Sequence, residues 1–272
     1  MSTLRRLLSL RWLLTSLLVL AAAGVMARLG IWQLDRLEWR RAFNARVSAQ
    51  INAPELDLNQ HRWKADDLFD MEYRAVTVQG EYDFSQQVLL RNQAWEERSG
   101  YRLLTPLRTA GGEAAVLVDR GWIPLEEAQD LSVYDEPGVV TVRGQIRRPQ
   151  TRPDFGGVPD PTLAPGETRL AAWNIINLER IQQQVPYELL PVYIQQAPDP
   201  GWTALPYRGL AEVELTEGSH QSYAMQWFAF AGLLLAGYPF FVRQQLRQKP
   251  DRGADVQADV EQRWLEEPGR IG

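Results

Sequence analysis

The chain has 272 residues, a formal net charge of −5 and no cysteine. Disulfides, thiolate metal sites and cysteine nucleophiles are therefore excluded. The chain contains two histidines, His61 and His220, which are too few for a multi-histidine zinc or di-iron centre. Apolar residues gather in two long runs near the ends, and the remainder has the composition of an ordinary soluble domain.

The first apolar run, Leu7–Ala27, predicts a transmembrane helix. Arg11 lies within a turn of its start, from which the side chain can reach the membrane interface. A cleavable signal peptide is the alternative, because Arg5 and Arg6 precede the run and small residues near its end could form a cleavage site. The next segment, Leu29–Ser48, mixes apolar and charged residues and predicts that the helix continues out of the membrane.

The second apolar run, Tyr223–Val242, is long enough to span a membrane and carries aromatic residues at both ends. Glutamates precede it and arginines follow it, so the side after the run should be cytoplasmic. Two spans place both termini in the cytoplasm, with the intervening part outside the plasma (inner) membrane. The chain is therefore divided into a helix (1–28), an extracytoplasmic domain (29–219), a second helix (220–242) and a charged tail predicted to be disordered (243–272).

The central region has the pattern of short strands separated by turns containing Gly and Pro. Pro106 is expected to end one strand, and Arg120–Trp122 to form a corner after the next. Residues 147–168 predict a long loop, and residues 178–184 a short helix. We expect an α+β fold with two transmembrane helices flanking a mainly antiparallel β domain, either a curled sheet or a small barrel. The predicted strands cover residues 73–80, 87–91, 101–105, 114–119, 139–146, 173–177 and 189–195.

The sequence argues against an enzyme. No Gly-rich phosphate loop, nucleophile elbow or paired-histidine motif occurs, and Gly111 and Gly112 form a predicted hairpin turn. Residues 43–218 contain 26 acidic and 16 basic side chains, which disfavours nucleic acid as a partner. His61 stands in a polar stretch and is predicted to be a surface residue.

His220 is a candidate haem ligand because of its position just outside the second span. It is predicted to lie in the first turn of the helix, with Ser219 as the N-cap. At helical spacing its face continues through Tyr223, Trp227 and Phe230, an apolar stripe that could cover a porphyrin while the imidazole binds the iron. The alternative is a histidine in the aromatic belt at the membrane interface.

Four segments appear in order within this two-helix frame: Leu29–Arg41, Gly100–Pro106, Val116–Pro124 and His220–Ala229. Their order and spacing resemble the Surfeit locus family (Surf-one type) of cytochrome c oxidase assembly proteins. Each segment alone is a weak signal, whereas the four together are specific. The resemblance extends over residues 28–238.

The resemblance implies a non-enzymatic assembly factor for haem–copper oxidase, working in the lipid bilayer with cytochrome c oxidase subunit I and other oxidase assembly factors. It also implies haem a as the cofactor, with His220 as the iron ligand. Tyr223 and Trp227 would then cover the porphyrin, and Arg120 could pair with a haem propionate. Gly121 and Trp122, in the family's internal motif, are expected to form a bulged strand corner with a packing tryptophan.

Two other functions stay open. The protein could be a membrane-tethered scaffold that stabilises oxidase intermediates by protein contact alone, with Arg36, Trp39 and Trp122 on its interaction surfaces. It could also be an anchored enzyme or sensor of the cell envelope. Haem colour in the purified protein separates haem delivery from the scaffold, and co-purification with oxidase subunits separates both from the third function.

Overall fold

The computed structural model describes residues 10–60, 63, 65–112, 114–210 and 212–247. The chain forms two compact units, one from Met1–Ala42 with Thr216–Gly272 and one from Phe43–Leu215. His61 lies outside the described residues, as does the predicted tail from residue 248 on.

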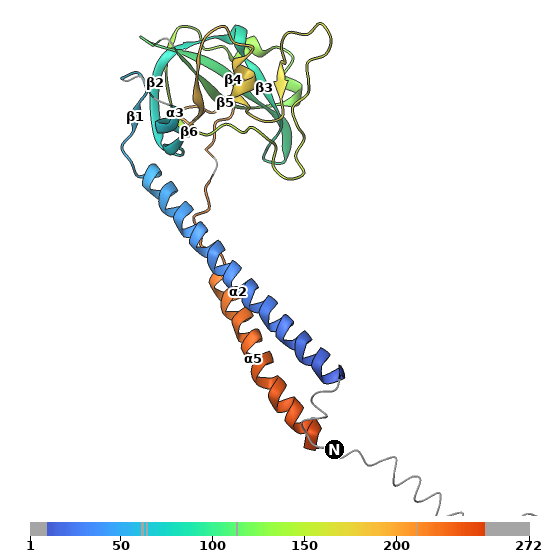
Figure 1. Ribbon diagram of the computed structural model, residues 1–272. Helices are drawn as coiled ribbons and strands as arrows, with labels where there is room; N and C mark the ends of the chain where they lie inside the picture. The colour runs from blue at the N-terminus through green and yellow to red at the C-terminus, as the bar shows by residue number, and fades with distance from the viewer. Residues whose placement is uncertain (1–9, 61–62, 64, 113, 211, 248–272) are drawn as a thin grey trace, which may run out of the picture. The chain divides into compact units, whose positions relative to one another are not determined.

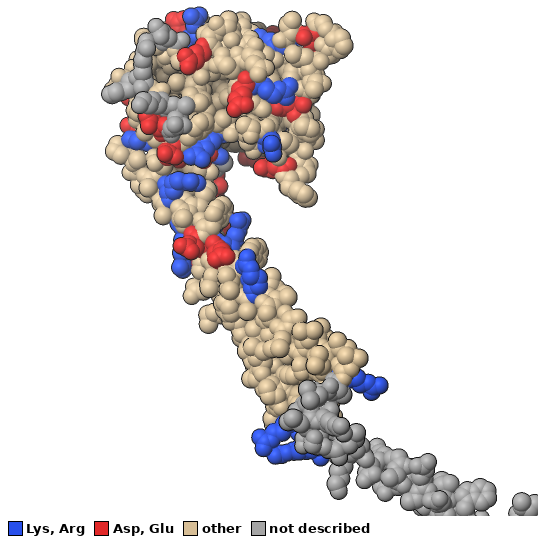
Figure 2. Space-filling view, in the orientation of Figure 1, with Lys and Arg blue, Asp and Glu red and all other residues tan. Residues whose placement is uncertain are grey.

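Two long helices make up the described part of the first unit. α2 (Leu10–Ile51) is continuous over 42 residues, which confirms that the helix runs far beyond the apolar segment; its residues from Phe43 on belong to the second unit. α5 (His220–Arg247) begins three residues before the predicted span and includes the first residues of the predicted tail. Both helices are long and apolar enough to cross a membrane. Figure 2 shows a stretch of this helix pair without charged side chains on the face in view.

Within this unit α2 and α5 run antiparallel, side by side (Figure 1). The hydroxyl groups of Ser16 and Tyr238 are 2.7 Å apart across the pair. Small residues seven positions apart on each helix are buried at the contact, a spacing typical of close helix packing in the coiled-coil manner. They are Ala23 and Gly30 on α2, and Ala224 and Ala231 on α5.

A closed five-stranded barrel forms the centre of the second unit. The ring consists of β2 (Ala75–Tyr82), β6 (Val139–Arg147), β8 (Leu189–Gln196), β5 (Ala115–Pro124) and β4 (Arg98–Thr109), in that order. Pairing of residues 80–82 of β2 with residues 107–109 of β4 closes the ring. Because the ring closes, the predicted domain is a barrel and not an open sheet. Of the five pairs in the ring, β5–β8 is parallel and the other four are antiparallel.

Short elements extend the ring on both sides. β3 (Val88–Trp95) pairs with β4, and the two-residue strands β1 (Leu56–Asp57) and β7 (Ala172–Trp173) pair with β2 and β3. Residues 148–171 contain no helix or strand, as predicted for the long loop. The remaining elements are the helices α3 (Ala65–Asp70) and α4 (Leu178–Gln182) and three 3₁₀ turns at Phe84–Gln86, Leu125–Glu127 and Leu131–Tyr134.

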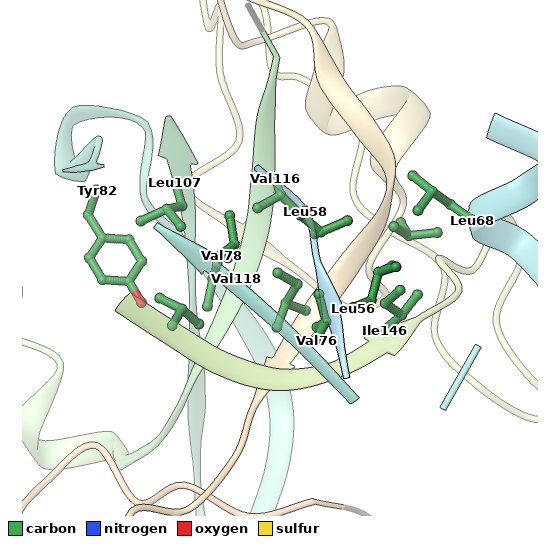
Figure 3. Packing of buried hydrophobic residues seen from close by; sticks show 13 residues of the cluster. Leu56, Leu58, Leu68, Val76, Val78, Tyr82, Leu107, Val116, Val118 and Ile146 are labelled. Carbon is green, nitrogen blue, oxygen red and sulfur yellow. The ribbon is translucent and has the colours of Figure 1, made fainter. Parts of the chain in front are cut away.

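All five ring strands send side chains into one core (Figure 3). Along β2 the buried and accessible residues alternate, because successive side chains of a strand point to opposite faces. β5 is buried at every residue: Val116 and Val118 face this core, whereas Ala115 and Leu117 pack in a second cluster with α4. Buried residues of the first core are Leu56, Leu58, Leu68, Val76, Val78, Tyr82, Leu107, Val116, Val118, Val142, Ile146, Val192 and Ile194.

The predicted strand end at Pro106 is wrong, because β4 continues to Thr109. The carbonyl of Pro106 accepts a hydrogen bond from the backbone N–H of Asp83 at 2.9 Å. The proline nitrogen faces the same edge of β4. Along this edge β4 pairs with β3 up to Leu104 and with β2 from Leu107, so Pro106 lies between the two ladders. No ladder donor is needed there, so the strand tolerates proline.

The predicted corner at Arg120–Trp122 is a β-bulge inside β5, not the end of the strand. Leu103 of β4 pairs with Gly121, and the next residue, Leu104, pairs with Asp119. Arg120 is therefore the extra residue of the bulge, and its backbone bends the strand without ending it.

Candidate functional site

His220 is the first residue of α5 and is half-buried. The carbonyl of Ser219 accepts the N–H of Tyr223 at 3.1 Å, so Ser219 has the N-cap position expected from the sequence. Gly218 precedes it with φ of +68°, and a Cβ built at Gly218 would lie 3.7 Å from Nε2 of His220. Nε2 therefore borders a residue that has no side chain.

Gln33 of α2 is the direct partner of His220. Its side-chain oxygen Oε1 lies 2.8 Å from Nδ1 of His220. Gln33 is half-buried and belongs to the first of the four family-like segments, whereas His220 opens the last. The helix pair thus brings together two segments from opposite ends of the chain. Sequence reasoning had named His220 and missed Gln33, although both lie in these segments.

A salt bridge joins α2 to the segment that leads into α5, three residues before His220. Nε and Nη2 of Arg41 each donate to the carboxylate of Glu217 at 2.9 Å, a forked pairing. The hydrogen bonds from Arg41 hold the pKa of the Glu217 carboxyl below its usual range. Both side chains are about half exposed, so the pair adds orientation more than stability.

The aromatic stripe below His220 lies partly within the helix contact and partly at the surface. Trp227 is half-buried, whereas Tyr223 and Phe230 are 49% and 44% exposed. The rings of Trp227 and Phe230 meet edge to face, with centroids 6.3 Å apart. Exposed aromatic rings therefore start one turn below the imidazole, on the same side of α5.

His220 and these rings fit one side of a haem, with a single nitrogen ligand and apolar contacts. The part of the chain that the structure describes contains no group of three or more His, Asp or Glu residues that could hold a metal ion. A haem on this face would have His220 as the ligand that α5 provides. Single ligation is weaker than double ligation and suits a cofactor that must be released.

Arg120 does not fit the predicted contact with a propionate. Its side chain is 0% exposed in the second unit, and its guanidinium donates to the Tyr134 carbonyl, to Gln87 at 3.1 Å and to Glu136 at 3.0 Å. It also lies 4.8 Å from the ring centroid of Tyr82, whose pKa is raised mainly by burial. A propionate would have to displace Glu136, so the structure gives Arg120 a stabilising role within the barrel.

The bulge also holds the chain segment that leaves the barrel. Trp122 and Tyr207 exchange two backbone hydrogen bonds of 2.8 Å, and their rings stack with centroids 6.1 Å apart. A Cβ at Gly121 would come within 2.6 Å of the Tyr207 carbonyl oxygen. Arg208 binds the same carboxylate of Glu136 as Arg120 does, at 2.8 Å. This agrees with the structural interpretation of Gly121 and Trp122.

Comparison with known proteins places these features in a family. The chain matches the model of the SURF1 family over residues 20–232. An uncharacterized SURF1-like protein of Mycobacterium bovis is 27% identical over 267 residues, 95% of each chain. A SURF1-like protein of Rickettsia felis is 23% identical, covering 84% of this chain and 97% of the relative, and one of Caenorhabditis elegans is 23% identical, covering 81% and 71%.

The match includes the whole barrel, Gln33 of α2 and His220 of α5. It also includes all four segments on which the resemblance was based. The SURF1 family is generally known for oxidase assembly factors and is not a known enzyme family. The chain therefore belongs to the SURF1 family.

Proposed function

We propose that this protein is a biogenesis factor for haem–copper cytochrome c oxidase that holds haem a at His220 and delivers it to subunit I. Membership of the SURF1 family supports the role in oxidase assembly. The observation that carries the haem proposal is the environment of His220: Nδ1 faces Gln33, and Nε2 borders Gly218. A non-enzymatic role and contact with other assembly factors are parts of the same proposal.

The proposal includes the location of the protein. Both helices cross the plasma (inner) membrane, and both termini are cytoplasmic. Arginines follow the apolar part of α5 and glutamates precede it, which supports this orientation. His220 then lies at the outer face of the membrane, where the protein can meet a membrane-embedded subunit of the oxidase.

The residues of α5 would divide the work of holding the cofactor. His220 would offer the lone pair of Nε2 to the iron, and Tyr223 and Phe230 would offer exposed rings to the porphyrin. Haem a would supply the redox-active iron that the oxidase itself uses. Because one imidazole is the only protein ligand in this arrangement, a partner that offers its own ligands can take over the group.

The test is an absorption spectrum of the full-length protein, purified in mild detergent from cells that make haem a. Wild type should carry a Soret band, and His220→Ala should lose most of it while still inserting in the membrane. His61→Ala, which removes the chain's other histidine, is the matched control and should keep the band. A colourless wild type from haem-replete cells would contradict haem carriage.

The scaffold is the second candidate, and the outer surface of α2 favours it. Trp32 and Trp39 are 50% and 51% exposed, seven residues apart on one face, and Arg36 lies 4.3 Å from the Trp39 ring centroid. Trp122 does not belong to such a surface, since it is 1% exposed. If Trp32→Ala with Trp39→Ala abolishes co-purification with subunit I while His220→Ala has no effect on assembly, the scaffold is the better description.

A further inference from the structure

We infer that Gln33 is a positioning residue for His220, selecting the imidazole tautomer in which Nε2 is the atom offered to iron. The inference rests on the proposed function and deepens it by assigning the ligating atom and the residue that prepares it. It is carried by the 2.8 Å contact between Oε1 of Gln33 and Nδ1 of His220.

The placement of Oε1 of Gln33 beside Nδ1 of His220 determines the direction of this hydrogen bond. The oxygen of a glutamine amide only accepts, so Nδ1 must carry the proton. A neutral imidazole protonated at Nδ1 has its lone pair on Nε2. A ligating histidine whose other nitrogen donates a hydrogen bond is held in one ring orientation and is a more basic ligand.

The surroundings of the pair support this reading. The side chain of Gln33 is half-buried and lies between Gly30 and Leu37, which are both buried on α2. Gln33 therefore lies at the contact of α2 with α5, where its amide is held against the imidazole. On the other edge of the ring, Gly218 leaves the space beside Nε2 without a side chain. Nδ1 is thus engaged by Gln33, whereas Nε2 borders a glycine.

The hydrogen bond could instead serve only to join the two helices. Both roles predict that Gln33→Leu weakens the helix pair, but only the positioning role changes the imidazole and the iron spectrum. Gln33→Glu retains an acceptor oxygen on a side chain of the same length and should rescue the positioning role. Gln221→Leu is the matched control, because Gln221 is an exposed glutamine next to His220.

The experiment uses the full-length protein in detergent, with ¹⁵N-labelled histidine and purified ferric haem a as the probe. Without haem, the His220 nitrogens of wild type should report the Nδ1–H tautomer, and those of Gln33→Leu a mixture of both. On titration with haem a, Gln33→Leu should bind about 10- to 100-fold more weakly with a shifted Soret band. Gln33→Glu and Gln221→Leu should stay close to wild type, and unchanged helicity in all variants shows that they fold.

Two outcomes would overturn the inference in distinguishable ways. If wild type binds haem a and Gln33→Leu binds it with the same affinity and Soret band, the inference fails and the proposed function stands. If wild type does not bind haem a, the proposed function fails, and the assignment of Nε2 as the iron ligand fails with it.

Discussion

The guanidinium of Arg120 is fully buried, because the side chain has no exposed surface. Glu136 compensates its charge, and the rings of Tyr82 and Phe84 lie 4.8 and 5.1 Å from the guanidinium carbon. An arginine in a sequence motif can thus be a buried structural group, although arginine is among the residue types that are almost never fully buried without a partner.

We expect Arg120→Met to lower the free energy of unfolding by about 3 kcal/mol, toward the lower end of the range for breaking a buried ion pair. The reason for the lower end is that Glu136 keeps Arg208 as a partner at 2.8 Å. Arg98→Met is the control, because its salt bridge with Glu126 is exposed, and it should change stability by less than about 1 kcal/mol. Denaturant unfolding of the full-length protein, followed by tryptophan fluorescence, measures both. Equal effects of the two variants would contradict the buried role.

At the scale of elements, the bulge of β5 explains why a glycine, Gly121, follows Arg120 in the chain. The extra residue forces Gly121 to a φ of +127°, a conformation that L side chains rarely adopt. The missing side chain also lets the backbone of Tyr207 approach and form an isolated bridge with Trp122. One bulge therefore shapes the strand and binds the segment that leaves the barrel.

Gly121→Ala should detach the segment around Tyr207, and Gly111→Ala should not. Both glycines have positive φ, but a Cβ at Gly111 would meet no described atom within 4 Å, whereas one at Gly121 overlaps the Tyr207 carbonyl. Gly111→Ala should therefore cost only the backbone penalty of about 1–2 kcal/mol, and Gly121→Ala more. Hydrogen exchange at the Tyr207 amide should be much faster in Gly121→Ala alone. Similar exchange rates in both variants would exclude displacement of the Tyr207 segment by the added Cβ.

At the scale of the whole molecule, charge follows the proposed orientation. α5 contains no acidic residue, and its described end carries Arg243 and Arg247. Between residues 43 and 218 acidic side chains outnumber basic ones. The arginines after the apolar part of α5 are what the positive-inside rule requires on the cytoplasmic side if the domain is displayed outside the cytoplasm.

Since the chain has no cysteine, single cysteines report this orientation without background. Thr162→Cys lies in the long loop of the barrel unit and Gln244→Cys near the end of α5, and both positions are exposed. A membrane-impermeant maleimide is added to intact cells from which the outer membrane and cell wall have been removed. It should label Thr162→Cys and leave Gln244→Cys unlabelled until the cells are lysed. The opposite pattern would refute the orientation.

Patterns of local origin were predictable from the sequence. Alternation located β2 and β6, and apolar length located both helices, because these signals depend on neighbouring residues. Pro106 was misread as a strand end because its tolerance depends on which edge of β4 faces β2 and β3. Ring closure, the burial of Arg120 and the pairing of Gln33 with His220 depend on residues distant in the chain, and single-sequence patterns do not contain them.

The place of β8 in the ring has a consequence for biosynthesis. Among the described residues β8 is the last strand to be made, yet it lies between β6 and β5 and not at an end of the sheet. Until residues 189–196 have emerged, the ring cannot close, and β5 and β6 each expose an unpaired edge. Barrel formation therefore waits for nearly the whole domain to be synthesised, and a chain truncated before Leu189 should be handled by the cell as an aggregation-prone fragment.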